Sequence, residues 1–323
     1  MSYGLVFGKF MPLHTGHLAL VEHALAHCDR VLLLVCAQPH EEIPGPLRFR
    51  WATETWAHIP RVTVAYTDVR LPYTDYSSRE ISRIWGAWFK QTYPDLTHVC
   101  TSEPYGDYLA EYMQVIHLPF DPGRVRQPIS ARQIRMDPMR YWEYLPAAVR
   151  PHYVRKVCIY GPESTGKSTL AARLAAHFDT VQVPEMARDL IPDSTGCTWD
   201  DLEQVVTAQT EAVERLARQA RRVLICDTDL LTTQVYARYL FQRELQVTPE
   251  QEAVHQYHLY LVPDTDVPYV QDGTRLGAHT QDDMKRLFIN ALEDRNIMYR
   301  LISGDWESRF RQAVQLVTAV AGY

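Results

Sequence analysis

Gly161-Pro-Glu-Ser-Thr-Gly-Lys-Ser168 lies between Val154–Tyr160, whose core Val157–Tyr160 is apolar, and a run of helix-forming residues, Leu170–His177. A buried strand, a glycine-rich turn and a helix are the context that a Walker A phosphate loop requires. In such a loop, backbone N–H groups surround the phosphates at the N-terminus of the helix. The sequence therefore predicts a nucleoside triphosphate site here. The alternative is a glycine-rich turn that carries an ordinary surface lysine.

Two side chains of this loop have specific roles in phosphate chemistry. Lys167 is placed to reach the β- and γ-phosphates, and the hydroxyl of Ser168 is placed to ligate Mg²⁺. We expect the nucleotide to contact Gly161, Glu163, Ser164, Thr165, Gly166, Lys167, Ser168 and Thr169.

An apolar strand that ends in aspartate follows the phosphate loop further along the chain. Residues 222–226 read as this strand, and Asp227-Thr-Asp229 follows it. This is the Walker B arrangement, in which Asp227 supplies a carboxylate to Mg²⁺ or its water shell. The alternative is an aspartate that only caps the next helix.

The start of the chain contains a second candidate phosphate site. Gly8-Lys-Phe-Met-Pro-Leu-His-Thr-Gly-His17 follows a short apolar strand and precedes a helical pattern. His14 and His17, three residues apart where a helix begins, can converge on one anion, and Gly16 allows close backbone approach. Lys9 adds a cation. Alone, a histidine pair of this kind is more often packing or surface.

Composition limits the class of protein. The chain has 323 residues, of which 46% are hydrophobic. It contains 33 Lys and Arg residues and 39 Asp and Glu residues, which gives a formal net charge of −6. The length favours two domains, here 1–152 and 153–323. The mildly acidic charge disfavours nucleic acid and membrane partners. Strands alternate with helices throughout, which predicts an α/β fold with two doubly wound parallel sheets.

The apolar runs and the cysteines indicate the cellular compartment. Val31–Ala37, the longest strongly apolar run, is too short to span a bilayer. The six cysteines show no metal-binding spacing and read as buried reduced thiols. We expect a soluble cytoplasmic protein.

The first motif resembles the G-x-F-x-P-x-H-x-G-H signature of the nucleotidyltransferase superfamily, whose members transfer an adenylyl or cytidylyl group onto a phosphate. The resemblance implies a Rossmann-like domain in which Gly8, Phe10, Gly16 and the two histidines contact the triphosphate, with His17 stabilising the transition state. Pro128–Arg135 resembles the superfamily's second motif, I-S-S-T-x-x-R. Ser130 and Arg135 match it, whereas Ala131 and Arg132 depart from it, so a hydroxyl contact is missing or replaced.

Three further residues are candidates for the first site, and the sequence leaves an alternative open for the first two. Ser130 with Gln133 is also a helix capping box, which needs no ligand. Trp85 belongs to an aromatic stripe that favours the core, although superfamily members acting on nicotinamide mononucleotide stack the base on an aromatic ring. Glu103 follows a predicted strand at the carboxyl end, where ligands bind in open α/β sheets.

A nucleotidyltransferase followed by a P-loop kinase resembles the NadR type of bifunctional protein, over nearly the whole chain. The resemblance implies a kinase that phosphorylates ribosylnicotinamide with ATP and Mg²⁺, and an adenylyltransferase that joins the nicotinamide mononucleotide to a second ATP, giving NAD and pyrophosphate. Some members also carry an N-terminal helix-turn-helix domain. Because the first predicted strand starts within five residues of Met1, we expect neither that domain nor DNA binding.

The kinase half contains further candidate residues. Glu185, Asp227 and Asp229 are the carboxylates that could orient the acceptor hydroxyl, and the sequence does not rank them. Arg188 and Asp272 are candidate substrate contacts. Arg275, between two glycines, is expected to be a transition-state cation on a lid, with a solvated surface arginine as the alternative.

Two other functions fit the same motifs. One keeps both folds with another acceptor, such as a phosphopantetheine-type adenylyltransferase fused to a different small-molecule kinase. The other is an NAD-level sensor with weak turnover. The sequence leaves open the relative strength of the activities, the preference between nicotinamide and nicotinate, feedback by NAD, and assembly into a homo-oligomer.

Overall fold

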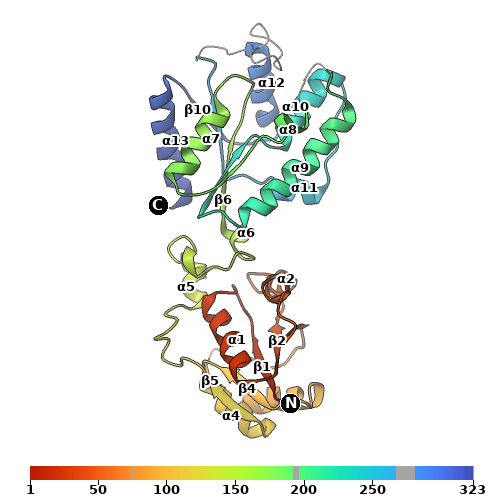
Figure 1. Ribbon diagram of the computed structural model, residues 1–323, viewed down its shortest axis with the longest axis vertical. Coiled ribbons are helices and arrows are strands. Elements are labelled where there is room, and N and C mark those ends of the chain that lie inside the picture. The colour runs from red at the N-terminus through yellow and green to blue at the C-terminus, as the bar shows by residue number, and fades with distance from the viewer. Residues whose placement is uncertain (74–75, 192–195, 267–280, 323) are drawn as a thin grey trace. The chain divides into compact units, whose positions relative to one another are not determined.

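The computed structural model describes residues 1–73, 76–191, 196–266 and 281–322. The chain divides into two compact units, Met1–Val149 and Arg150–Tyr323, each built around one five-stranded sheet (Figure 1). The strand pairs that form the two sheets are parallel. The predicted fold class, α/β with two doubly wound parallel sheets, is confirmed.

The first sheet has the strand order β3-β2-β1-β4-β5, in which the order reverses beside the first strand. Its strands are β1 (Tyr3–Gly8), β2 (Arg30–Cys36), β3 (Val62–Thr67), β4 (His98–Thr101) and β5 (Ile116–Pro119). The helices of this unit are α1 (Thr15–His27), α2 (Gly45–Trp56), α3 (Arg79–Thr92), α4 (Tyr105–Met113) and α5 (Ala131–Met136), followed by the 3₁₀ turn η1 (Trp142–Tyr144).

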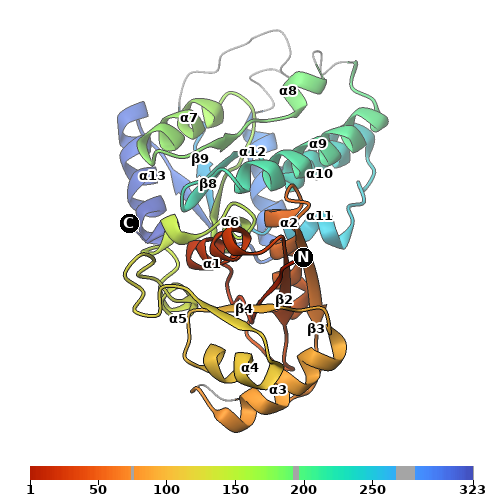
Figure 2. The ribbon, with the colours of Figure 1, turned by 60° about the horizontal axis from the view of Figure 1, so that its bottom comes forward.

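Helices cover both faces of the first sheet, which explains why its central strands are apolar throughout. Leu5, Leu34 and Val99 pack with Phe89 of α3 and Leu109 of α4 on one face. Helices α1 and α2 contact the strands from the opposite face, as Figure 2 shows. The residues that follow the strands at their carboxyl ends are therefore the ones left available to a ligand.

The second sheet has the order β10-β9-β6-β8-β7, with the strand before the phosphate loop in the middle. Its strands are β6 (Arg155–Ile159), β7 (Gln182–Val183), β8 (Val223–Asp227), β9 (Leu259–Pro263) and β10 (Tyr299–Ile302). The helices of this unit are α6 (Arg150–Tyr153), α7 (Lys167–His177), α8 (Ala187–Leu190), α9 (Trp199–Ala217), α10 (Leu230–Phe241), α11 (Pro249–Val254), α12 (Gln281–Glu293) and α13 (Trp306–Ala321).

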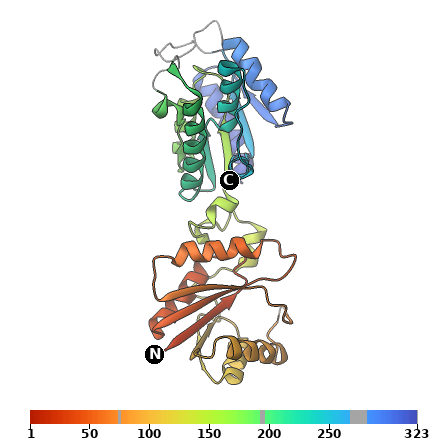
Figure 3. The ribbon, with the colours of Figure 1, turned by 90° about the vertical axis from the view of Figure 1, so that its right-hand side faces the viewer.

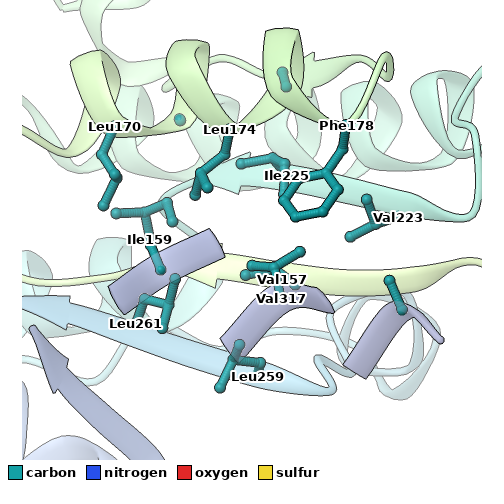
Figure 4. Close-up of a cluster of buried hydrophobic side chains, with 14 of the residues drawn as sticks. Val157, Ile159, Leu170, Leu174, Phe178, Val223, Ile225, Leu259, Leu261 and Val317 are labelled. Atoms are coloured by element: carbon teal, nitrogen blue, oxygen red, sulfur yellow. The ribbon is translucent and has the colours of Figure 1, made fainter. Parts of the chain in front are cut away.

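Alternate residues of the central strand β6 point to opposite layers of helices. Val157 and Ile159 pack against Leu174 of α7 and Val317 of α13, as Figure 4 shows. Cys158 instead faces a cluster formed by α10 and α12. Figure 3 shows this unit from the side, with its helices against the sheet. No helix in the described ranges is long and apolar enough to cross a membrane.

Candidate functional site

The first candidate site lies at the carboxyl end of β1. The chain leaves this strand at Gly8, and α1 begins after His14, which is its N-cap residue. Strand β4 pairs with β1, so the turn that follows β4 brings Glu103 to the same edge of the sheet. Parallel pairing thus joins two motifs that are far apart in the sequence.

The rings of the two motif histidines lie against each other at an interplanar angle of 30°, and their hydrogen bonds fix the ring protons. Their ring centroids are 3.7 Å apart. Nδ1 of His14 accepts from the Gly16 N–H at 3.1 Å, and Nδ1 of His17 accepts from the His14 N–H at 3.2 Å. A neutral imidazole that accepts at Nδ1 carries its proton at Nε2. Each ring therefore offers an Nε2–H donor.

Burial keeps both rings neutral. Burial and, secondarily, the charge of Arg124 lower the pKa of His14 to about 3. Burial lowers the pKa of His17 well below its ordinary value, and His14 and Arg124 add to the effect. Gly16 makes this packing possible, because a Cβ there would lie 2.9 Å from Cε1 of His14. The predicted histidine pair is thus assembled as two neutral donors.

Two adjoining hollows meet at His17. The larger has a volume of about 490 Å³ and includes Lys9, Trp85 and Arg135 among its lining residues. The smaller, of about 220 Å³, includes His14, Gly16 and Ser130. The two hollows share the lining residues Phe7, Gly8, Phe10, His17, Glu103, Tyr105 and Ala131. The predicted residues of the first site are therefore gathered around one continuous depression.

Trp85 belongs both to the core and to the larger hollow. Its Nε1–H donates to the Pro72 carbonyl at 2.9 Å, and its ring packs near Phe7 with centroids 6.5 Å apart. Tyr73 and Tyr76 line the same hollow, and the sequence reasoning did not single them out. The lining of the hollow thus includes several aromatic rings, which suit a planar heterocycle.

Carboxylates hold the predicted cations of the larger hollow. Lys9 Nζ lies 3.2 Å from Glu41 and 3.7 Å from the centroid of the Tyr73 ring. Arg135 pairs with Glu42 at 3.2 Å, and its guanidinium also donates to the Met11 carbonyl. These contacts place both cations on the wall of the hollow.

Ser130 caps α5 and also lines the smaller hollow. Its Oγ accepts from the Gln133 N–H at 3.3 Å and donates to the Gln133 side chain at 2.8 Å. Ser130 is therefore the N-cap residue of α5, and this role does not remove it from the hollow. Ala131 lines both hollows, whereas Arg132 is exposed and lines neither.

The phosphate loop of the second unit holds its own lysine. Lys167, which is buried, donates from Nζ to the Pro162 carbonyl at 2.9 Å, and Thr165 Oγ1 donates to the same oxygen at 3.0 Å. Gly166 has φ +82°, and a Cβ at this position would lie 2.3 Å from the ring of Trp306. Only glycine fits this point of the loop.

Glu185 and Asp227 meet at the carboxyl ends of neighbouring strands. Val183 of β7 is in register with Cys226 of β8, so the residues that follow the two strands are brought together. Burial and the charge of Glu185 raise the pKa of Asp227, while Lys167, Ser168 and Arg188 lower it. Arg188 pairs with Glu185 at 2.8 Å.

The residues predicted to hold Mg²⁺ fit that ion. Ser168 Oγ and Asp227 Oδ1 are buried, and neither atom has a hydrogen-bond partner of normal geometry among the residues that the structure describes. Buried polar atoms without partners are costly, and a hard cation satisfies both oxygens. Among the residues that the structure describes, no group of three or more His, Cys, Asp and Glu side chains is placed to hold a metal ion.

Asp229 is fully engaged in structural contacts. Its Oδ2 accepts from the Tyr260 hydroxyl at 2.8 Å, and its Oδ1 accepts from the Thr232 N–H at 3.0 Å as the N-cap of α10. Burial raises its pKa, against the effect of these hydrogen bonds. Its geometry is that of a buried cap.

Other predicted residues of the loop surround this centre. Glu163 accepts from the Tyr236 hydroxyl at 3.2 Å, Ser164 has φ +60°, and Thr169 lies beside Trp306 in a small hollow. Asp272 and Arg275 lie outside the residues that the structure describes.

Arg309 fastens the back of the phosphate loop, and no sequence signal marked it. It is buried, and its guanidinium donates to the carbonyls of Thr165 at 3.0 Å, Gly304 at 2.9 Å and Asp264 at 2.9 Å, besides pairing with Asp266. One side chain thus ties the loop to the ends of β9 and β10.

Comparison with known proteins extends over both units. A family model described as an AAA domain matches residues 156–309. The chain is 30% identical, over 346 aligned positions, to the trifunctional NAD biosynthesis/regulator protein NadR of Escherichia coli strain K12. The alignment covers 99% of this chain and 84% of that protein. The Salmonella typhimurium protein of the same name is 28% identical, with the same coverage of each chain.

Solved structures of NadR proteins have the same fold. One NadR protein, crystallised in complex with NR, superimposes with a TM-score of 0.79 at 22% identity, over 100% of this chain and 96% of that one. A NadR structure in complex with NAD and AMP-PNP gives a TM-score of 0.78, also at 22% identity and with the same coverage.

Proposed function

The chain belongs to the NadR family, and we propose that it is a bifunctional enzyme of NAD biosynthesis. The second unit phosphorylates ribosylnicotinamide with ATP, and the first unit joins the resulting nicotinamide mononucleotide to a second ATP, releasing pyrophosphate and forming NAD. The observation that carries the proposal is a 30% identity that extends across both phosphate-binding units. The NR, NAD and AMP-PNP bound in the solved NadR structures support the choice of substrates.

In the adenylyltransferase step, the phosphate of the mononucleotide attacks the α-phosphorus of ATP. That phosphate is already anionic, so the reaction needs no general base, and catalysis depends on positioning and charge neutralisation. The Nε2–H groups of His14 and His17 donate to triphosphate oxygens, Lys9 and Arg135 supply positive charge, and Gly8, Phe10, Gly16 and Ser130 shape the phosphate subsite. His17, shared by both hollows, lies where the reacting groups meet.

The larger hollow takes the nicotinamide end of the mononucleotide. Trp85, Tyr73 and Tyr76 line it and provide flat surfaces for the pyridine ring. Glu103 lines both hollows and is placed beside the sugar and phosphate portions. This assignment gives each predicted residue of the first unit a position along one of the two substrates.

In the kinase step, the phosphate loop holds ATP and a carboxylate orients the acceptor. Lys167 exchanges the Pro162 carbonyl for phosphate oxygens, and Gly161, Glu163, Ser164, Thr165, Gly166 and Thr169 form the cradle around them. Ser168 and Asp227 hold Mg²⁺, which neutralises phosphate charge. Because Asp229 is committed to Tyr260 and Thr232, Glu185 is the carboxylate left to orient the ribosyl hydroxyl, with Arg188 holding it. Asp272 and Arg275 remain candidates as a substrate contact and a transition-state cation.

The decisive experiment measures NAD formed from ribosylnicotinamide, ATP and Mg²⁺ by the complete chain. Lys167→Ala should stop this reaction and leave NAD formation from added nicotinamide mononucleotide intact. Phosphopantetheine serves as the control acceptor for the rival adenylyltransferase. Failure of the wild-type chain to form NAD from either nicotinamide substrate would contradict the proposal, and binding without turnover would favour the sensor instead.

A further inference from the structure

The phosphate subsite of the first unit keeps Ser130 but lacks the hydroxyls that its motif would ordinarily supply at positions 131 and 132. Ala131 lines the smaller hollow without a polar group, and Arg132 lies exposed outside both hollows. Lys9 and Arg135 line the larger hollow. The smaller hollow therefore needs another source of positive charge beside the histidine pair if it is to bind phosphate.

Arg124 supplies a charge at that position. It lines the smaller hollow together with His14, His17 and Ser130. Its charge acts on both histidines, since it lowers the pKa of each. Its guanidinium pairs with Glu103 at 3.0 Å, and the two side chains are each 45% exposed. Arg124 is thus a half-exposed cation whose present partner is a carboxylate on the rim of the site.

The backbone around Arg124 is strained, and one carboxylate holds it in shape. Asp121 and Arg124 have φ values of 44° and 51°, in the left-handed region. The Asp121 carboxylate accepts from the N–H groups of Val125, Arg126 and Gln127 at 2.8, 3.0 and 2.9 Å. Strain of this kind persists only where the surroundings fix it, and it is concentrated at functional sites. The loop is built to present one side chain.

We propose that Arg124 binds phosphate oxygens of the nucleotide in the first unit, exchanging the Glu103 carboxylate for phosphate. This proposal rests on the adenylyltransferase function proposed above. A planar guanidinium suits the exchange, because it can donate two parallel hydrogen bonds to a carboxylate or to a phosphate. The phosphate belongs either to the triphosphate of ATP or to the mononucleotide. Removing the guanidinium should weaken the binding of the substrate that carries this phosphate, which distinguishes the two sources.

The test compares two arginines of the same loop in the complete chain. Arg124→Gln and Arg126→Gln remove the same charge two residues apart, and of the two only Arg124 lines the smaller hollow. For each variant, kcat and KM are measured with ATP and with added nicotinamide mononucleotide, together with inhibition by pyrophosphate. Thermal unfolding midpoints show that both variants are folded, as expected for exposed side chains.

Arg124→Gln should lower kcat/KM for one substrate by roughly tenfold to a hundredfold, the loss expected for one charge-assisted hydrogen-bonded contact. A lower kcat/KM for ATP together with weaker inhibition by pyrophosphate assigns the contact to the triphosphate. Loss for the mononucleotide alone assigns it to the other phosphate. Arg124→Lys should recover part of the activity, since a point charge replaces one of the two hydrogen bonds, and Arg126→Gln should stay within about twofold.

The results that would overturn the role of Arg124 differ from the result that would contradict the adenylyltransferase function. A folded Arg124→Gln variant within about twofold of wild type for both substrates overturns the proposal, as does an equal loss in Arg126→Gln, which would indicate a general effect of charge. A wild-type chain that forms no NAD from nicotinamide mononucleotide contradicts the proposed function itself. The two failures are therefore separable.

Glu103→Gln gives an independent measurement of the exchange. Without its carboxylate, Arg124 loses the partner that competes with phosphate, so the KM for the substrate identified above should fall about two- to fivefold. The same substitution should have no such effect when Arg124 is already Gln, because the pair then no longer exists. An equal effect in both backgrounds would contradict the exchange.

Discussion

The ring of Trp306 lies directly against Gly166, so closely that a Cβ on this glycine would be 2.3 Å from the indole. Gly166 also has φ +82° and is the N-cap residue of α7. A ring from the segment after β10 thus limits which residue the phosphate loop can contain. This contact leads to the first prediction.

Gly166→Ala should lower the kinase kcat/KM by more than about a hundredfold, because both the left-handed backbone and the indole oppose a side chain. Gly196→Ala is the matched control, since a Cβ there has nothing within 4 Å. Adding Trp306→Ala should restore activity only in part, because the backbone strain remains. Kinase activity of Gly166→Ala close to that of Gly196→Ala would show that the loop can move away from the ring.

His17→Ala should abolish adenylyl transfer while phosphorylation of ribosylnicotinamide continues and nicotinamide mononucleotide accumulates. Losing one preorganised donor to the transition state costs about 3–4 kcal/mol, on the order of 10²–10³ in kcat. His27→Ala, at the exposed end of the same helix, is the control. A loss below about tenfold would assign His17 to packing rather than to catalysis.

Two aspartates at the carboxyl end of β8, Asp227 within the strand and Asp229 after it, should separate function from stability. Asp227→Asn should lower kinase activity by on the order of 10²–10³, yet stabilise the fold by about 1 kcal/mol, because burial raises the pKa of this carboxyl above its ordinary value. Asp229→Ala should cost about 2–4 kcal/mol of unfolding free energy, since it removes the cap of α10 and the acceptor of the Tyr260 hydroxyl.

Steady-state kinetics and urea unfolding of both aspartate variants check this contrast. If Asp229→Ala were stable but inactive, Asp229 would belong to the chemistry after all, and Glu185 would lose its assignment as the orienting carboxylate.

Acid should destabilise the second unit through His255. Burial lowers the pKa of this ring to about 3, whereas the unfolded chain takes up a proton near pH 6.5. The stability is therefore complete above about pH 6.5 and is lost as the pH falls below it, by about 1.4 kcal/mol at roughly pH 5.5. His14, with a pKa also near 3, should act in the same direction in the first unit.

His255→Gln should remove this loss of unfolding free energy and so reduce its slope against pH. The reason is that the Thr210 and Tyr257 hydroxyls then contact a side chain that does not titrate. His177→Gln, at an exposed ring of the same unit, is the comparison variant. Urea unfolding between about pH 7.5 and pH 5.5 measures the slope. Equal slopes in wild type and His255→Gln would mean that the folded protein binds this proton as well, so that burial does not keep the ring neutral.

The phosphate loop and the histidine motif could be located from sequence because close backbone approach and a strand-to-helix turn require particular residues at fixed spacing. The same reasoning could not place Arg124 or Arg309. Both positions depend on hydrogen bonds to backbone groups, which every residue type has and which therefore leave no pattern in the sequence. The loop that carries Arg124 is held by three N–H groups that donate to the Asp121 carboxylate, and Arg309 is held by three carbonyl oxygens that accept from its guanidinium.

Spacing also gave no means to choose among Glu185, Asp227 and Asp229. That choice depends on strand pairing and on a tyrosine hydroxyl from another strand. Strand β5 was not anticipated either, since it has four residues, two of them exposed. Short edge strands of this kind show little of the apolar pattern on which sequence-based prediction depends.

Arg309 also has a consequence for synthesis on the ribosome. Its bond to Thr165 spans 144 residues of chain, so the phosphate loop receives its supporting side chain long after the loop itself has emerged. The first unit ends at Val149 and needs nothing that follows it for its sheet. A translating chain should thus acquire the adenylyltransferase fold first and a competent kinase loop only when α13 is present, and a nascent chain halted before residue 304 should hold the loop without that support.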